Sequence, residues 1–149
     1  MLKKLNTNSQ FPHRTERDCS KWCKEKLPDK LINLELCSYG GEGNVRTTKV
    51  EKVDGEFTYC NRKKKHMFFY DLEIKINWEA KIADRVVAGH IRIPSLSEDE
   101  DLKNTEIRVA TDAKSSDGDE LMKLIKSQAI PKLRDILQLF LDETKERKI

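Results

Sequence analysis

The alternation of apolar and polar side chains predicts one long strand near the middle of the chain. From residue 68 to residue 78 every second side chain is apolar, and Asp71, Glu73, Lys75 and Asn77 stand between them. The apolar members are Phe68, Tyr70, Leu72, Ile74, Ile76 and Trp78. Successive side chains of a strand point to opposite faces of a sheet, so this pattern is typical of an antiparallel strand with one buried face.

Shorter patterns predict further strands on both sides of this one. Ile32, Leu34 and Leu36 alternate with polar residues, and further candidates lie at residues 45–53, 57–60, 86–93 and 106–111. We expect turns at residues 40–44 and 61–65, a turn or bulge at Asp54-Gly55, and an end to the strand 86–93 at Pro94. The connections are too short for crossover helices, so the strands are predicted to pair antiparallel.

Helical spacing occurs near both ends of the chain. We expect Thr15 to cap a helix with Asp18 at its third position, and Pro28-Asp29 to end it. Its apolar stripe is Cys19, Trp22, Cys23 and Leu27. A second stripe, at spacings of three and four, runs from Leu121 to Phe140 after a loop at residues 115–119. Pro131 lies within it, either kinking one long helix or occupying the first turn of a second helix.

These elements predict an α+β fold. An antiparallel meander sheet is covered on one face by an N-terminal helix and a long, Pro-interrupted C-terminal helix. Residues 1–14 carry no periodic pattern and are interpreted as a flexible arm, followed by a single domain at residues 15–149. A length of 149 residues suits one domain. Leu, Ile, Val and Phe make up about a quarter of the chain, enough for a core despite the 37% of charged residues.

Composition narrows the function classes. The net charge of +3 argues against a protein that wraps DNA, and the chain contains neither an apolar run that could span a bilayer nor a signal-peptide pattern at its start. The cysteines, Cys19, Cys23, Cys37 and Cys60, form no C-x-x-C pair. Four reduced thiols in a cytoplasmic protein are the expectation.

Motifs for catalysis and for metal binding are scarce. His13, His66 and His90 stand outside the usual hydrolase and metalloprotease motifs, and no phosphate-binding glycine motif is present. A Cys/His nucleophile pair is the remaining catalytic alternative. Cys19, Cys23 and His13 would supply three ligands where a structural zinc needs four, so core packing explains the two cysteines better. We expect no catalytic residue, cofactor or metal.

A run of cations is the most marked surface feature. Arg62, Lys63, Lys64 and Lys65 stand at the predicted turn, and residues 44–66 together carry seven basic and three acidic residues. Acidic loops at 98–101 and 117–120 offset this charge, and the turn has no interleaved aromatic residues. A protein partner therefore fits better than nucleic acid, although a nucleic-acid-binding module that uses this turn is the alternative. The same cations could also merely discourage edge pairing. A small-molecule carrier is a weaker hypothesis, because no convergent buried polar groups are evident.

Five segments together resemble a known family. They are N-R-K-K-K at 61–65 followed by F-F-Y-D at 68–71, T-E-R-D at 15–18 with Trp22, D-G-E at 54–56, G-H-I-R-I-P at 89–94, and P-K-L-R at 131–134. In this order they are similar to the N-terminal domain of the activators of the ATPase of the 90-kDa heat-shock-protein chaperone. The resemblance covers about residues 13–142.

The resemblance implies a co-chaperone and not an enzyme. Such a domain would bind the middle domain of the chaperone and stimulate its ATPase by favouring the active conformation of the catalytic loop. Arg62, Lys63 and Lys65 would be central, with Lys64 beside them, and Glu56 with Asp54 would belong to the binding surface. The implied protein is cytoplasmic, monomeric when free, and without a nucleic-acid or membrane partner.

Three departures from the family pattern stand out. Lys64 replaces the usual glycine of the basic motif, and Phe11-Pro12-His13-Arg14 stands where the family has an Asn-rich stretch with W-H-W. Longer members also carry a second, C-terminal domain, so this chain is expected to be either a short member or a fragment.

Overall fold

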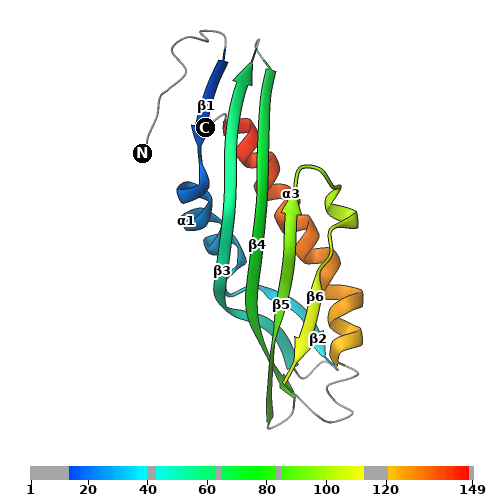
Figure 1. The fold of residues 1–149 in the computed structure, drawn as a ribbon. Helices are drawn as coiled ribbons and strands as arrows, with labels where there is room; N and C mark the ends of the chain where they lie inside the picture. Colours follow the sequence, from blue (N-terminus) through cyan, green and yellow to red (C-terminus); the bar gives the residue numbers. More distant parts are fainter. Residues whose placement is uncertain (1–13, 40–42, 63–64, 83–84, 113–120, 148–149) are drawn as a thin grey trace.

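The computed structural model describes residues 14–39, 43–62, 65–82, 85–112 and 121–147. In chain order the elements are β1 (Arg14–Asp18), α1 (Ser20–Leu31), β2 (Glu35–Tyr39), β3 (Gly43–Arg62), β4 (Lys65–Ile82), β5 (Arg85–Ser97), the 3₁₀ turn η1 (Leu102–Asn104), β6 (Arg108–Thr111), the π turn η2 (Ile125–Ala129) and α3 (Ile130–Arg147). The strands form one six-stranded antiparallel sheet in the order β1-β3-β4-β5-β6, and β2 also pairs with β3 (Figure 1).

The helices cover one face of this sheet, and the core lies between the two layers. The predicted alternation in β4 is confirmed, because the side chains at every second position from Phe68 to Trp78 are all buried. Both helices lie behind the long strands in the view of Figure 1. They contribute fully buried leucines to the core, among them Leu27, Leu31, Leu133 and Leu137. The predicted fold class, an antiparallel sheet with an N-terminal and a long C-terminal helix, is confirmed.

The start of the first helix differs from the prediction. Thr15 does not cap a helix but lies in β1, opposite Asn61 of β3. The helix begins at Ser20, whose backbone N–H donates a 2.9 Å hydrogen bond to the carboxylate of Asp18. Pairing along the edge of β3 therefore keeps residues 14–18 extended. Of the predicted arm, only Arg14 belongs to the described residues.

Two prolines that were expected to end elements lie inside them. The first helix continues past Pro28 to Leu31, which brings the fully buried Leu31 to the core side one turn after Leu27. β5 continues past Pro94 to Ser97. Between Ile93 and Leu96 it has one more residue than the facing stretch of β4, so Pro94 lies in a β-bulge, where a ladder hydrogen bond is not required of it.

Residues 45–60 form one strand and not two. β3 passes through the predicted turn at Asp54-Gly55 and stays in register with β4 there, with Gly55 opposite Leu72. The segment around Ile32 is less strand-like than predicted, since β2 begins only at Glu35 and Ile32 is 43% exposed. The predicted turn at 40–44 and the loop at 115–119 fall largely or wholly outside the described residues.

The C-terminal helical segment contains a local change of winding before Pro131. Residues 121–124 are α-helical, η2 follows, and α3 begins at Ile130, so Pro131 lies in the first turn of α3. The N–H of Ile130 donates to the carbonyl of Ile125, five residues earlier. A proline ring would crowd the carbonyl four residues before it, and a wider turn at this point relieves that conflict.

Candidate partner-binding surface

The basic residues predicted to bind a partner lie at the free end of the β3–β4 hairpin. Arg62 is the last residue of β3 and stands opposite Lys65, the first residue of β4. Lys65 is exposed; Lys63 and Lys64 connect the strands and lie outside the described residues. We call residues 62–65 the basic tip. In Figure 1 the hairpin extends well beyond the end of β5.

Aromatic side chains support the hairpin directly below the basic tip. The ring of Phe57 stacks on that of Tyr70, with centroids 5.0 Å apart, and Phe68 contacts the rings of both Phe57 and Tyr59 at 5.7 Å and 5.2 Å. All four side chains are buried. The two long strands pair as far as residues 62 and 65, and this aromatic cluster packs against the core side of the paired part.

The predicted acidic residues lie on the same hairpin but at a distance from the basic tip. Glu56 is exposed and stands opposite Asp71; Asp54 stands opposite Glu73, and its carboxylate is 3.6 Å from Nζ of Lys24 on α1. Six residues of extended strand separate Glu56 from Arg62, a span of roughly 20 Å. A partner that contacts both must therefore follow the hairpin along its length.

Ion pairs neutralise the middle of the sheet face that carries no helix. The carboxylate of Glu73 accepts from Lys52 at 3.0 Å and from Arg92 at 2.8 Å, and these contacts lower its pKa. Glu51 accepts from Asn77 at 2.9 Å and pairs with Lys75 at 3.3 Å, with the same effect on its pKa. Lys52, one of the seven basic residues counted between residues 44 and 66, is therefore already paired with a carboxylate of this chain.

The remaining cations of this region do not gather into one patch. Arg46 lies near the opposite end of β3 from the basic tip and donates a 3.1 Å hydrogen bond to the carbonyl of Asn33. Residues 46 and 62 are separated by on the order of 50 Å of strand. A nucleic-acid strand needs a continuous cationic track, and this spacing does not favour one.

Sequence reasoning missed an exposed apolar residue near the basic tip. Phe69 is 45% exposed and points away from the core, and Met67 beside it on the same face is partly exposed. The alternation that places Phe68 and Tyr70 inside already implied that residues 67 and 69 face outward. An aromatic side chain therefore does stand close to the cations, although it lies outside the turn itself.

Acidic side chains gather beyond Phe69. A hollow of about 580 Å³ beside Asp71 is lined in part by Asp99, Glu100 and Glu106. The acidic loop at 98–101 is thus placed next to the hairpin, whereas residues 117–120 lie outside the described part of the chain. Along one side of the molecule the charge changes from the basic tip to an acidic region.

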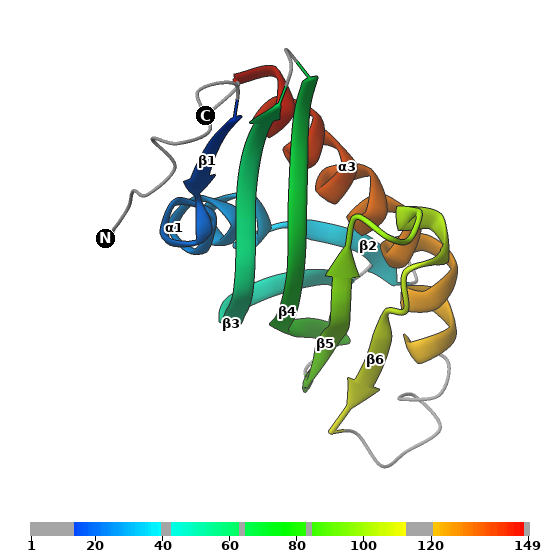
Figure 2. The same cartoon turned by 45° about the horizontal axis from the view of Figure 1, so that its top comes forward.

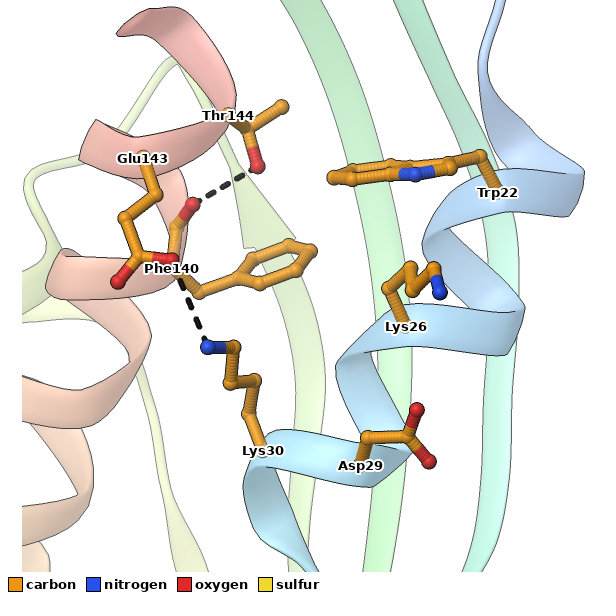
Figure 3. Close-up of a pocket in the computed structure, with 7 residues that line it drawn as sticks. All are labelled: Trp22, Lys26, Asp29, Lys30, Phe140, Glu143 and Thr144. Carbon is orange, nitrogen blue, oxygen red and sulfur yellow. Dashed lines mark hydrogen bonds and ion pairs between the residues drawn. The ribbon is translucent and has the colours of Figure 1, made fainter. Parts of the chain in front are cut away.

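A hollow of about 320 Å³ lies between α1 and α3 (Figure 3). The indole of Trp22 stacks on the ring of Phe140 with centroids 5.8 Å apart, and Lys30 pairs with Glu143 at 3.5 Å. The hydroxyl of Thr144 donates to the carbonyl of Phe140 at 2.8 Å. The stacked rings and the ion pair join α1 to α3, and the hydroxyl of Thr144 is bonded within α3, so the hollow offers little support to the small-molecule-carrier hypothesis.

The cysteines are suited to core packing and not to catalysis. Cys19 and Cys23 are buried at 3% and 0% exposure, which confirms the packing interpretation, and all four cysteines are free thiols. Burial raises the pKa of Cys23 to about 12 and also raises the pKa values of Cys19 and Cys37, so these thiols stay protonated near neutral pH. Among the described residues no group of three or more His, Cys, Asp or Glu side chains is placed to hold a metal ion. His13 lies outside them.

No helix within the described ranges is long and apolar enough to cross a membrane.

Comparisons with known proteins agree with the fold and the motifs. The human activator of 90 kDa heat shock protein ATPase homolog 1 is 35% identical over 140 residues, which cover 93% of this chain but 40% of the human protein. The chain thus spans about two fifths of the length of that relative. A yeast protein of similar length, the Hsp90 co-chaperone HCH1 of Saccharomyces cerevisiae, is 24% identical, with 93% of this chain and 91% of that protein covered.

A solved structure and a family model complete the comparison. The solution structure of the human Aha1 N-terminal domain matches with a TM-score of 0.67 at 32% identity, covering 87% of this chain and 94% of the solved one. The model for the family described as "Activator of Hsp90 ATPase, N-terminal" matches residues 16–148. The chain therefore belongs to the family of the N-terminal domain of activators of the Hsp90 ATPase.

Proposed function

We propose that this chain is a co-chaperone that binds the middle domain of the 90 kDa heat shock protein chaperone and stimulates its ATPase. The family membership and the names of the relatives support this assignment. The observation that carries it is the basic tip, which resembles the family's basic motif apart from Lys64 and stands at the end of a hairpin packed on aromatic side chains. The proposed unit is the single domain at residues 15–149, acting in the cytoplasm and monomeric when free.

The proposed mechanism needs no chemistry from this chain, because ATP hydrolysis takes place on the chaperone. Arg62, Lys63, Lys64 and Lys65 would pair with acidic groups of the chaperone near its catalytic loop. A loop that can take two conformations shifts only if the ligand binds one of them more tightly. Cationic groups at the end of this paired hairpin would stabilise the loop conformation whose charges match their position.

The acidic residues would give the complex its orientation. Glu56 and Asp54 lie along the hairpin at roughly 20 Å from the basic tip. Two contact points of opposite sign exclude a partner surface in the reversed orientation, since like charges would then meet. The exposed ring of Phe69 lies between them and offers apolar contact area.

The test of this function is the steady-state ATPase rate of the chaperone as the chain is titrated in. A specific inhibitor of the chaperone's nucleotide site defines the background rate, so that only chaperone turnover is counted. We expect a saturable rise in the rate. If the rate stays flat while calorimetry detects binding, the proposed stimulation is wrong. If calorimetry detects no binding, the proposed partner is wrong as well.

The nucleic-acid alternative predicts different behaviour. Oligonucleotide affinity should be at least micromolar at low salt and should fall steeply as salt rises, because bound counterions are released from the phosphates. Absence of such binding at low salt would eliminate it.

A further inference from the structure

One edge of β4 is left open beside the basic tip. β5 ends its pairing at Ser97, opposite Asp71, while β4 continues to Lys65 (Figure 1). Within the described part of the chain, residues 65–70 of β4 therefore have a strand neighbour on the β3 side and none on the other side. Unpaired backbone groups along such an edge are able to receive another strand.

The direction of the free backbone groups follows from one hydrogen bond. The N–H of Tyr70 points to the open side and donates at 2.8 Å to the carboxylate of Glu98. The N–H and C=O groups of a strand residue point to the same side, and this side alternates along the strand. The backbone groups of Phe68 and His66 therefore also face the open edge. Glu98 takes the place that a carbonyl of a neighbouring strand would occupy.

A groove of about 520 Å³ runs beside this edge and is lined by residues of the open part of β4, the acidic turn after β5 and the C-terminal part of α3. The backbone of these three segments can be followed in Figure 2. Its apolar lining includes Phe69, Leu102 and Leu141, and its charged lining consists of Glu98, Glu100 and Asp101 against Lys145. Open backbone groups, an apolar floor and a mainly acidic rim thus occur side by side.

We propose that this edge and groove bind an extended peptide segment of a partner protein, in which basic and apolar residues alternate, as an added strand on β4. The backbone of the peptide would pair with Phe68 and His66, its apolar side chains would enter the groove, and its basic side chains would face the rim. This inference rests on the open edge and on the groove beside it, and it does not depend on the proposed effect on the ATPase.

The charge of the rim favours a basic segment as the occupant. Glu98, Glu100 and Asp101 outnumber Lys145 along the groove, so basic side chains of the segment would meet opposite charge there. In an antiparallel pairing of two copies, Lys65 of each would stand near the acidic rim of the other, so self-association of the chain is a distinct outcome of the test.

The probe for this proposal is a fluorescein-labelled, end-capped hexapeptide, Lys-Val-Lys-Leu-Lys-Val, titrated with the full chain and followed by anisotropy. We expect saturable binding, together with slower amide hydrogen exchange at Phe68. Three control peptides separate the contribution of backbone pairing from that of charge. Two of them carry methyl groups on alternate backbone nitrogens, one peptide starting from the first residue and the other from the second. Because only one of these two sets of N–H groups can face β4, methylation should weaken one of the two peptides about tenfold. Replacement of every Lys by Glu should abolish binding.

Variants of the chain test the same contacts. His66→Pro removes the N–H that faces the open side, and Glu100→Lys with Asp101→Lys reverses the rim; both should weaken the peptide about tenfold. Glu25→Lys with Glu79→Lys makes the same change of charge elsewhere on the surface and should leave affinity unchanged. Equal binding of the methylated peptides, equal binding of the acidic peptide, or dimers of the chain that exclude the peptide would each overturn the proposal.

Discussion

The backbone at Gly55 has a φ of +127°, a conformation that L-amino acids other than glycine rarely adopt. A Cβ at this position would overlap the carbonyl oxygen of Asp71 on the neighbouring strand. The glycine that read as a turn therefore lets β3 continue past it in close contact with β4. The result is one long hairpin that can hold the basic tip at its end.

Replacement of this glycine tests its role. We predict that Gly55→Ala lowers the free energy of unfolding by about 3 kcal/mol, because the strained backbone and the overlap must both be accommodated. Chemical denaturation monitored by circular dichroism measures the change. Glu79→Ala, at an exposed position of β4, is the matched control and should change stability by less than about 0.5 kcal/mol. Equal stability of both variants would contradict the role of Gly55.

The buried thiol of Cys23 gives a pH dependence with a defined sign. Its pKa in the folded chain is about 12, against an ordinary value of 9.0. Above pH 9 the unfolded chain loses this proton first, so the thiol makes the folded state progressively less stable as pH rises toward 12. Between pH 8 and pH 10 we predict a loss of about 1.4 kcal/mol that Cys23→Ala does not show. Stability curves of the two proteins that stay parallel over this range would refute the prediction.

At the scale of elements, the contact between α1 and α3 depends on one aromatic pair. Phe140 stacks on Trp22 (Figure 3). Phe140 is 4% exposed, whereas its neighbour Leu139 is 58% exposed. We predict that Phe140→Ala costs about 3 kcal/mol of stability and shifts the Trp22 emission to the red, because the indole loses its cover. Leu139→Ala should change neither quantity by much. A similar effect of both substitutions would mean that the helices do not depend on this contact.

The periodic pattern of the sequence predicted those elements whose side chains alternate between core and solvent. It missed the elements whose side chains do not alternate in this way. β4 was predictable because every second side chain is buried. β1 was not, since its residues Arg14–Asp18 are all polar and the strand is held by backbone pairing with β3. Pro28 and Pro94 led to wrong predictions of where α1 and β5 end. Burial of Leu31 favours the continuation of α1 past Pro28, and a bulge accommodates Pro94 within β5.

The candidate site was predictable in its parts but not in its arrangement. The cations at 62–65 were evident from the sequence as a turn between two strands. Glu56 and Asp54 lie on this hairpin at a distance from the turn, because β3 is continuous. Gly55 obscured this continuity, since the glycine was interpreted as part of a turn. The open edge of β4 follows from where β5 stops, and no local pattern of side chains encodes that end point.

At the scale of the whole molecule, the net charge of +3 conceals a separation of charge. The basic tip stands at one end of the hairpin, ion pairs neutralise the middle of the sheet, and carboxylates gather around Asp71 and the turn after β5. A surface of this kind can fix the orientation of a charged partner over a long contact. The central claim is that the basic tip acts on the chaperone while the rest of the domain positions it.

The most direct test of this claim is the chaperone ATPase rate with Lys63→Ala combined with Lys65→Ala. We predict a folded protein of unchanged stability, because Lys65 is exposed, that stimulates at most about one fifth as much as the unaltered chain. Lys81→Ala with Lys126→Ala removes the same charge at exposed positions away from the basic tip and should stimulate normally. Full stimulation by the folded double variant of the basic tip would contradict the account.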